Sequence, residues 1–403
     1  MQPALTVDEA LARILAAAAP IADVERRDLL AAHGQVLAEP LAARRTQPPF
    51  DASAMDGFAV RAADIAALPA TLRLIGEAAA GRSFGGTLGA GEAVRIFTGA
   101  PVPAGADAIV IQEDADLSGT TVTVREGKPS IEHIRPRGGD FAAADVLLAA
   151  NRKLTSRDIT LAAAMGYPTL PVRRPPLVAI LATGDELVLP GIEPGPDQIV
   201  CSNTFGVAGM VRAAGGTPRL LGIARDTETS LGEAVDRAAG ADVLVTIGGA
   251  SVGDHDLVGP VLKSRGMKLD FWKIAMRPGK PLMYGKLGAQ HVLGLPGNPV
   301  SSLVCARLFL RPLIRALCGL PPETDVALMA RTTTAITANG PRAHYMRGTT
   351  SRAPDGTLEV TPAASQDSSL MRPLAGADCL IVRPIGAAAV ERGGEVPLLL
   401  LDF

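Results

Sequence analysis

The sequence predicts a multidomain α/β protein with a doubly wound parallel sheet, a β-rich segment before it and a small β domain after it. Between residues 177 and 300, short apolar runs alternate with loops and helical segments, which is typical of parallel strands joined by crossover helices. Between residues 45 and 140, β-like runs are separated by Gly and Pro turns. Residues 322–403 also contain short β-like runs, and they follow a Pro-Pro boundary.

The composition is that of a large globular protein with no strong bias toward a polyanionic partner. The chain has 403 residues, 47% of them hydrophobic, which is enough to bury several cores and excludes global disorder. Its formal net charge is -2, so we expect no dedicated nucleic-acid surface. The four cysteines form no CxxC pair and the five histidines no metal-ligand spacing, so we expect neither a disulfide scaffold nor a structural zinc site.

Two features of the chain indicate a cytoplasmic location. Asp8 and Glu9 stand where a signal peptide would carry basic residues. No uninterrupted apolar run approaches the ~18 residues that a membrane-spanning helix needs, so we expect no membrane partner.

The elements are expected in the following order. Residues 1–45 have a helical pattern that opens on a capping box from Thr6 to Glu9. Residues 141–174 return to helix, with one helix expected at 156–165. Strands of the β-rich segment are expected at 58–61, 72–77, 108–112 and 120–124. In the α/β region, strands are expected at 177–181, 218–223, 242–247 and 291–294, and helices at 204–214, at 228–239 and after residue 299. The last strands are expected at 357–360, 379–382 and 396–401.

These patterns predict four domains. A helical linking domain takes residues 1–44 and 141–175, although its first helix could pack on the α/β domain instead. The β-rich inserted domain is residues 45–140, the α/β domain is 176–321, and the C-terminal β domain is 322–403.

Chemistry-bearing residues cluster at the strand ends of the α/β region, where open parallel sheets bind ligands. Glu186 and Asp226 follow two of these strands. A glycine-rich turn follows a third, and its bare backbone N–H groups can approach a phosphate. The turn and the residues after it include Gly248, Gly249, Ser251, Gly253 and Asp256. Each feature alone also fits a tight turn or a helix cap, but five loops at one sheet edge indicate a site.

Two further clusters point to an anionic ligand. Pro296, Gly297 and Asn298 lead into a helix that contains Ser301, and a helix N-terminus with free N–H groups binds anions. Lys273, Arg277 and Lys280 lie within eight residues beside two prolines. This group is either a solvated face or a clamp for phosphate or another oxyanion. Carboxylates and cations in one site suggest Mg²⁺ with a phosphorylated ligand.

Several motifs, taken together and in this order, are specific. They are Ser53-Ala54-Met55-Asp56-Gly57-Phe58-Ala59-Val60, Phe97-Thr98-Gly99-Ala100-Pro101-Val102-Pro103, Thr183-Gly184-Asp185-Glu186-Leu187, Gly248-Gly249-Ala250-Ser251-Val252-Gly253-Asp254 and Leu295-Pro296-Gly297-Asn298-Pro299. Over nearly the whole chain, this combination resembles the MoeA/gephyrin-type molybdenum insertases.

The resemblance implies an activity and an architecture. Members of this family convert adenylylated molybdopterin and molybdate into molybdenum cofactor, release AMP and use Mg²⁺. They are homodimeric molybdopterin molybdenumtransferases of four domains, with a MogA-like pterin-binding domain and a C-terminal domain that resembles a β-barrel. The cleft is shared between subunits, and the product could pass to other molybdenum-cofactor proteins.

The resemblance also implies roles for individual residues. Asp56, Thr98 and Asp140 would be the partner subunit's contribution to the cleft. Glu186, Asp226 and Asp256 would surround the metal and nucleotide, with Glu186 and Asp256 as the metal ligands. Lys273, Arg277 and Lys280 would handle molybdate and phosphate. Arg347 and Ser368 match positions near the cleft.

Two departures from the family pattern leave the expected chemistry in place. Phe58 stands where the family often has Tyr, and Arg277 stands where some members have Lys. Three alternatives stay open: a non-catalytic pterin carrier or scaffold, a molybdopterin adenylyltransferase, and an insertase that selects tungstate. The retained carboxylates and the full-length match favour the molybdenum insertase over the first two, but the sequence does not separate molybdate from tungstate.

Overall fold

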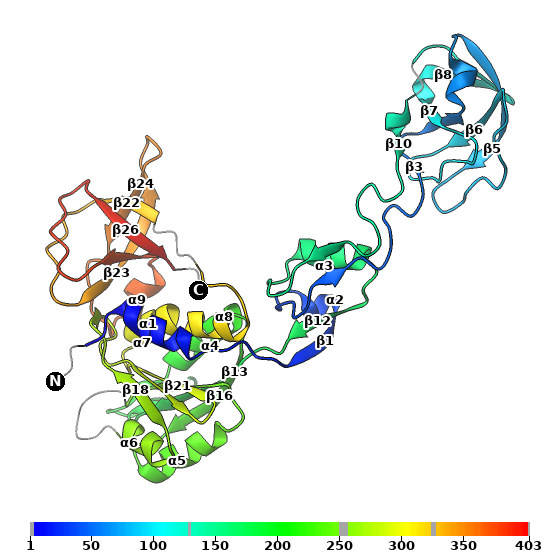
Figure 1. The fold of residues 1–403 in the computed structure, drawn as a ribbon. Coiled ribbons are helices and arrows are strands. Elements are labelled where there is room, and N and C mark those ends of the chain that lie inside the picture. The colour runs from blue at the N-terminus through cyan, green and yellow to red at the C-terminus, as the bar shows by residue number, and fades with distance from the viewer. Residues whose placement is uncertain (1–3, 128–129, 250–256, 324–327, 402–403) are drawn as a thin grey trace.

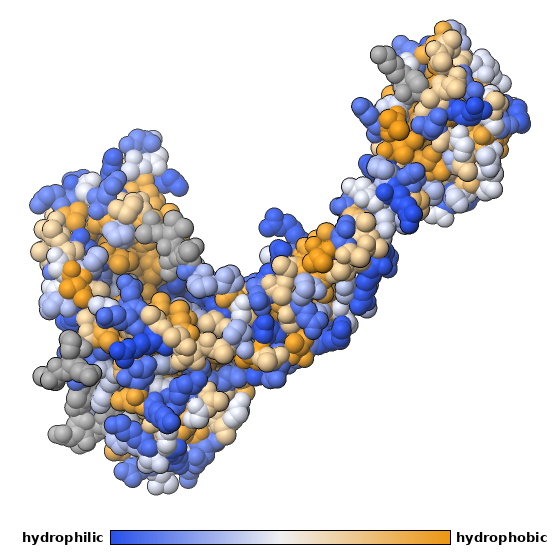
Figure 2. All heavy atoms as spheres, in the orientation of Figure 1, coloured by the Kyte–Doolittle hydropathy of each residue, from blue (hydrophilic) through white to orange (hydrophobic). Residues whose placement is uncertain are grey.

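The computed structural model describes residues 4–127, 130–249, 257–323 and 328–401. The chain forms an α/β body with the C-terminal domain packed on it, and an arm that leads to a distal β domain (Figure 1). Figure 2 shows this arm as a narrow column of mixed polar and apolar surface. No helix among the described residues is long and apolar enough to span a membrane.

The first helix belongs to the α/β body. Helix α1 (Val7–Ala16) opens on the predicted capping box, in which the Thr6 hydroxyl accepts a hydrogen bond from the backbone N–H of Glu9 at 3.2 Å. Its apolar face, which includes Ile14, joins the core of the α/β domain.

The prediction of helix throughout residues 1–45 was wrong beyond α1. Strand β1 (Val24–Asp28) pairs antiparallel with β12 (Thr169–Arg173), and α2 covers only Leu29–Ala32. The partner strand lies so far along the chain that no local pattern could reveal the pairing.

The rest of the arm is a small linking unit and a distal β domain. The linking unit also contains β2 (Leu41–Ala42) paired with β11 (Val146–Leu148), and α3 (Ser156–Ala164), close to the helix predicted there. The short ladder of β3 (Ala52–Ser53) with β10 (Ile134–Arg135) joins it to the distal domain. The distal sheet has the order β7-β4-β6-β5-β9-β8. Its strands are β4 (Gly57–Val60), β5 (Ala70–Ala78), β6 (Glu92–Ile96), β7 (Ala108–Ile111), β8 (Ala115–Ser118) and β9 (Thr121–Val124).

The α/β domain contains the predicted doubly wound sheet, with the order β16-β13-β17-β21-β20-β18. Strands β16 (Thr217–Ala224), β13 (Leu177–Thr183), β17 (Val243–Ile247) and β21 (Gln290–Leu295) are parallel. Strands β20 (Met283–Leu287) and β18 (Lys268–Trp272) extend it antiparallel, which the sequence did not predict.

Helices cover both faces of this sheet. Helices α5 (Glu228–Arg237) and α6 (Val258–Ser264) pack on one face. The other face carries α1 and α4 (Asn203–Ala213) together with a continuous helical run of α7 (Pro299–Cys305), a π-helical segment (Ala306–Leu310) and α8 (Arg311–Leu317). The two cores confirm the α/β fold class.

The C-terminal domain is a closed β-barrel. Strands β23 (Ala343–Arg352), β24 (Leu358–Pro362), β22 (Leu328–Thr332), β26 (Glu395–Leu400) and β25 (Cys379–Arg383) follow one another, and β25 pairs back with β23. A short strand of the α/β domain, β19 (Met276–Arg277), adds to β23 in parallel. The barrel and the α/β domain are therefore joined by backbone pairing, and α9 (Met371–Ala375) lies between them.

Candidate functional site

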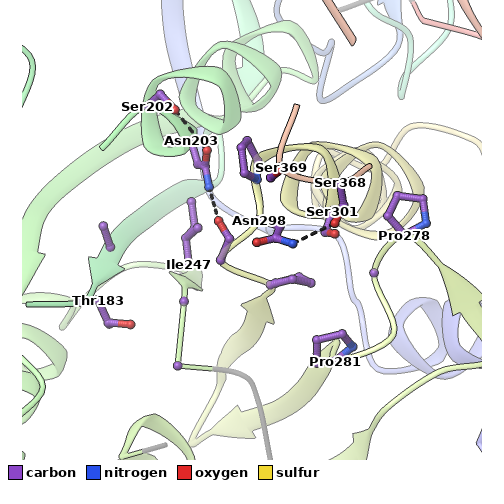
Figure 3. A pocket seen from close by; sticks show the side chains of 18 of the residues that line it. Thr183, Ser202, Asn203, Ile247, Pro278, Pro281, Asn298, Ser301, Ser368 and Ser369 are labelled. Atoms are coloured by element: carbon purple, nitrogen blue, oxygen red, sulfur yellow. Dashed lines mark hydrogen bonds between the residues drawn. The ribbon is translucent and has the colours of Figure 1, made fainter. Parts of the chain in front are cut away.

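A cleft of about 920 Å³ lies at the carboxyl edge of the parallel strands and extends to the barrel. The loops after β13, β16, β17 and β21 all contribute to it, as the sequence predicted from the parallel topology. Residues 276–281 also line it, because they directly precede β20, whose antiparallel direction places its first residue at this same edge. Figure 3 shows the cleft between these loops.

The glycine turn after β17 approaches its neighbours too closely for any side chain. Gly248 has φ +96°, and a Cβ there would lie 2.6 Å from the carbonyl oxygen of Thr183. Gly249 has φ +57°, and its Cβ would lie 2.5 Å from Val258. Both glycines line the cleft, so bare backbone is presented there, as phosphate binding requires. Ser251, Gly253 and Asp256, which were predicted to belong to the site, lie outside the described residues.

The residues just before α7 are held by hydrogen bonds to other parts of the chain, and no side chain at the helix start caps it. Pro299 takes the first helical position, and the Asn298 side chain makes no capping hydrogen bond. Its amide instead donates to the Ser368 hydroxyl of the barrel domain at 2.8 Å, and Asn203 donates to the Gly297 carbonyl at 2.7 Å (Figure 3). Pro296, Gly297, Asn298 and Ser301 all line the cleft. This helix start is therefore not the open set of N–H groups that the sequence predicted, because Pro299 has no N–H and the Val300 N–H donates to the Ser368 carbonyl at 3.1 Å.

Three cationic side chains, Arg277, Lys280 and Arg342, line the end of the cleft next to the barrel. The Arg277 guanidinium donates to the Asn339 side chain at 3.4 Å. The Asn339 amide is itself anchored by three backbone carbonyls at 2.7 to 2.9 Å. This end of the cleft therefore has the charge and the donors to bind a small oxyanion.

His344 lines the same end and is buried. Burial, followed by the charges of Arg277, Arg347 and Arg342, lowers the pKa of His344 to about 4. Its imidazole is consequently neutral at physiological pH and adds no charge to the site.

Two carboxylates, Glu186 and Asp226, line the opposite end of the cleft. They follow β13 and the edge strand β16, so the sheet order separates them from the cationic end. Among the described residues, no group of three or more His, Cys, Asp or Glu side chains could hold a metal ion. One or two carboxylates beside a turn of bare backbone fit Mg²⁺, which keeps several waters and takes its other ligands from phosphates.

Several residues predicted for the site lie elsewhere in this chain. Asp56 and Thr98 are in the distal domain, at the far end of the arm from the cleft (Figure 1). They lie together, because the Asp56 carboxylate accepts hydrogen bonds from the Thr98 backbone N–H at 2.7 Å and its hydroxyl at 2.8 Å. These bonds, the backbone one foremost, hold the pKa of Asp56 below its usual range. Asp140 lines a separate hollow of about 410 Å³ beside α3.

Two cationic residues that were predicted for the site belong to the domains around the cleft but do not line it. Among the described residues, the lining includes neither Lys273 nor Arg347. Lys273 has φ +76°, and its ammonium group lies 5.7 Å from the centre of the Trp272 ring. Arg347 is buried behind the lining, with 1% of its surface exposed. Ser368, in contrast, lies in the lining as predicted.

Five further lining residues were not predicted from the sequence: Asn203, Arg342, His344, Gln366 and Ser369. All but Asn203 come from the barrel domain, and they reach the cleft because the barrel docks on the α/β domain through the β23–β19 pairing and the contacts of Ser368 with α7. The Gly-Pro turn before Arg342 was the one local signal available, and it indicates only a loop.

The fold and the cleft define a class: a long-armed, multidomain protein whose α/β domain opens a cleft at its carboxyl edge. Residues 179–316 match the family described as "Probable molybdopterin binding domain". Residues 5–166 match "MoeA N-terminal region (domain I and II)", and residues 329–401 match "MoeA C-terminal region (domain IV)".

Relatives of known name agree with these matches. A "Molybdopterin molybdenumtransferase" of Nostoc sp. is 38% identical over 391 residues, covering 94% of this chain and 89% of the relative. One of Haemophilus influenzae is 34% identical over 401 residues, covering 98% of both chains. A crystal structure of the molybdopterin biosynthesis MoeA protein from Pyrococcus horikoshii OT3 superposes with a TM-score of 0.82 at 26% identity, covering 99% of this chain and 100% of the other. The chain belongs to the MoeA family.

Proposed function

We propose that the chain acts in molybdenum cofactor biosynthesis as a molybdopterin molybdenumtransferase. In this proposal it inserts molybdate into adenylylated molybdopterin and releases AMP. The observation that carries it is the order of groups along the cleft: carboxylates at one end, bare glycine backbone in the middle and cations at the other end. The glycine backbone and the carboxylate end suit a phosphate chain with its metal ion, and the cationic end suits a separate tetrahedral oxyanion.

Molybdate would bind at the cationic end. Arg277 and Arg342 offer planar forks of N–H donors, and Lys280 adds a compact charge. The Ser368 hydroxyl lines the same region and, because it accepts from Asn298, can donate its own proton to a remaining oxygen, whereas the Ser369 hydroxyl donates to Asp367. These groups would hold the oxyanion beside the dithiolene sulfurs of the pterin, which is positional and electrostatic work.

The phosphate chain would lie over the glycine turn, with Mg²⁺ at the carboxylate end. Glu186, which was predicted as a metal ligand together with Asp256, would hold the ion, and Asp226 lines the same end of the cleft. Bound Mg²⁺ supplies positive charge to phosphate oxygens as the phosphoanhydride bond breaks. Gly248 and Gly249 would orient the same phosphates through backbone N–H groups.

A homodimer with a shared cleft is part of this proposal. The Asp56–Thr98 pair is preorganised and ionised, with Asp56 half-buried and Thr98 exposed, yet the arm carries it away from the cleft of its own chain. A second subunit whose arm approached this cleft would add that carboxylate to the site. Mixing Asp56→Asn and Lys280→Ala subunits tests this: a shared cleft restores activity in the mixed dimers, and two independent clefts leave the mixture inactive.

The activity is tested by AMP release from adenylylated molybdopterin, with and without molybdate and Mg²⁺. The proposal predicts molybdate-dependent release by the wild type and strongly reduced release in Asp56→Asn, Glu186→Gln and Lys280→Ala. Wild-type rates in all three variants would overturn the assignment of the site. Tight pterin binding with no AMP release would indicate a carrier, and repeating the assay with tungstate separates an enzyme that selects the other oxyanion.

A further inference from the structure

The arm is joined to the α/β body by two short connections, residues 17–23 and 174–176, which together form a joint. The chain leaves α1 through the first connection, forms the whole arm, and returns through the second into β13. The two connections lie side by side at the foot of the arm (Figure 1), because β1 and β12 pair directly beyond them and the Arg174 N–H donates to the Asp23 carbonyl at 2.9 Å. The direction in which the arm leaves the body is therefore decided at this joint.

One side chain, that of Arg174, ties both connections to the central sheet. Its Nε donates to the Asp23 carboxylate at 3.0 Å, and its two terminal nitrogens donate to the two carboxylate oxygens of Asp242 at 2.9 and 3.0 Å. Asp242 directly precedes β17, and its carboxylate also accepts from the N–H of Leu177, the first residue of β13, at 2.7 Å. The guanidinium thus links the foot of the arm to the starts of two neighbouring strands of the sheet.

The Arg174–Asp242 pair is a strong and directional contact. The two side chains are 31% and 21% exposed, and the bidentate geometry of an Arg–carboxylate pair constrains their relative orientation. Burial alone would raise the pKa of Asp242, but hydrogen bonds from Arg174 and from the Leu177 N–H hold it below its usual range. Both partners are therefore charged at physiological pH, and removing one leaves the other partly buried without its counter-charge.

Other contacts hold the arm on the body independently of Arg174. The Ile21 N–H donates to the Leu317 carbonyl at the end of α8 at 2.8 Å, and Val36 of the linking unit belongs to the core of the α/β domain. A single backbone hydrogen bond and an apolar contact constrain orientation less than a planar fork of donors does. We therefore expect Arg174 variants to fold, with an arm that stays attached but is less narrowly oriented.

Arg174 is remote from the cleft of its own chain. It binds the amino edge of the parallel strands, whereas the cleft lies at their carboxyl edge, and its described lining includes none of Arg174, Asp23 and Asp242. We propose that Arg174 is a positioning residue for the shared cleft, which sets the direction of the arm and thereby the place where Asp56 and Thr98 meet a second subunit. A small rotation at the joint becomes a larger displacement at the end of the arm, and a displacement of about 1 Å in a positioning group can cost a factor of about 100. This inference rests on the proposed function, because it needs the cleft to be shared.

Small-angle X-ray scattering of the full-length protein tests the joint without any ligand. Arg174→Met keeps a long side chain but loses the contacts with both carboxylates, so the long-distance peak that the distal domain contributes to the pair-distance distribution should broaden. Arg174→Lys keeps the charge without the planar fork and should broaden this peak less. The matched control is Arg265→Met, which removes another bidentate pair of the same domain, that with Asp236 at 3.0 and 3.1 Å, and should leave the distribution unchanged. A wild-type distribution in Arg174→Met would overturn the inference.

Kinetics separate a displaced arm from a damaged α/β domain. In Arg174→Met, kcat for AMP release should fall about 10- to 100-fold. Equilibrium binding of molybdate should stay unchanged, because the cations of the cleft belong to the same α/β domain and its barrel rather than to the arm. AMP release at the wild-type rate would contradict the inference. Weakened molybdate binding would also contradict it, because the substitution would then act on the cleft of its own chain.

Mixed dimers give the sharpest test. If Arg174 acts through the arm, Arg174→Met subunits mixed with Lys280→Ala subunits should regain activity, because the second subunit brings an intact arm to the intact cleft of the first. Arg174→Met mixed with Asp56→Asn should stay impaired, because both arms are then defective. The opposite pattern would mean that Arg174 supports its own α/β domain, and would overturn the inference. An inactive mixture of Asp56→Asn with Lys280→Ala would contradict the shared cleft of the proposed function, whereas broadened scattering in Arg174→Met would still assign the direction of the arm to Arg174.

Discussion

Gly279 lies in the cationic loop between Arg277 and Lys280, at a point where only glycine fits. Its φ is +108°, and a Cβ there would lie 2.4 Å from the Cys305 Sγ of α7. The free energy of unfolding should therefore fall in Gly279→Ala for two separate reasons. A left-handed backbone costs a residue with a Cβ about 1–2 kcal/mol, and overpacking a closed core costs about 1–3 kcal/mol.

Two comparison variants separate these contributions. Gly288 has φ +61°, and a Cβ there would have no neighbouring heavy atom within 4 Å, so Gly288→Ala should lose only the backbone part, about 1–2 kcal/mol. In the double variant Gly279→Ala/Cys305→Ala, the sulfur is gone, and the overpacking part should be recovered. Removing the sulfur alone leaves a small cavity, so Cys305→Ala must be measured as the reference for the double variant.

The assay is denaturant unfolding followed by fluorescence of the single tryptophan, Trp272, which lies on β18 and reports on the α/β domain alone. Gly279→Ala should be less stable than Gly288→Ala, and its KM for molybdate should rise because Lys280 moves with the loop. Equal stability of Gly279→Ala and the wild type would refute this reasoning. So would a double variant in which removing the sulfur recovers nothing.

Three further predictions address the cleft and the core. Glu186→Gln should slow AMP release about 100-fold. Equilibrium binding of molybdate should stay unchanged, because Glu186 lies at the end of the cleft away from the cations. Weakened molybdate binding would contradict this separation of the two ends. Asn339→Ala should raise the KM for molybdate about tenfold by releasing the Arg277 guanidinium. If the same substitution raised KM equally in an Arg277→Lys background, Asn339 would not act through Arg277. Burial, then the Lys286 charge, lowers the pKa of His291 from 6.5 to about 4, so between these values only the unfolded state gains the proton and stability falls as pH falls. We expect a loss of about 2 kcal/mol from pH 7 to pH 5, and His291→Gln, measured by urea unfolding at both pH values, should remove most of that slope.

The parallel part of the sheet could be predicted from the sequence because each strand is a short, continuous apolar run bounded by turns. Strand β17, for example, is buried at all five positions. The antiparallel edge could not be predicted in this way: β18 has mixed burial, and its pairing with β20 depends on the whole sheet being in place. Strand β1 was not predicted either, because its partner β12 follows the entire inserted domain in the sequence.

The site residues also include some that the sequence could predict and some that it could not. Glu186, Asp226 and Gly248 could be placed because parallel topology brings strand ends to one edge. Arg342 and His344 could not, because they enter the cleft through the docking of a separate barrel. Arg347 was predicted for the site, but its side chain is buried in the barrel and does not line the cleft, and the sequence does not show which way a strand side chain points.

In the function proposed above, one cleft joins a tetrahedral oxyanion to a pterin while a phosphoanhydride bond is broken. The most direct test is a single-turnover reaction with adenylylated molybdopterin, molybdate and Mg²⁺, in which released AMP and pterin-bound molybdenum are both quantified. We expect equal amounts of the two products, formed together and only when molybdate is present. AMP released at the same rate without molybdate, or with no molybdenum on the pterin, would contradict it.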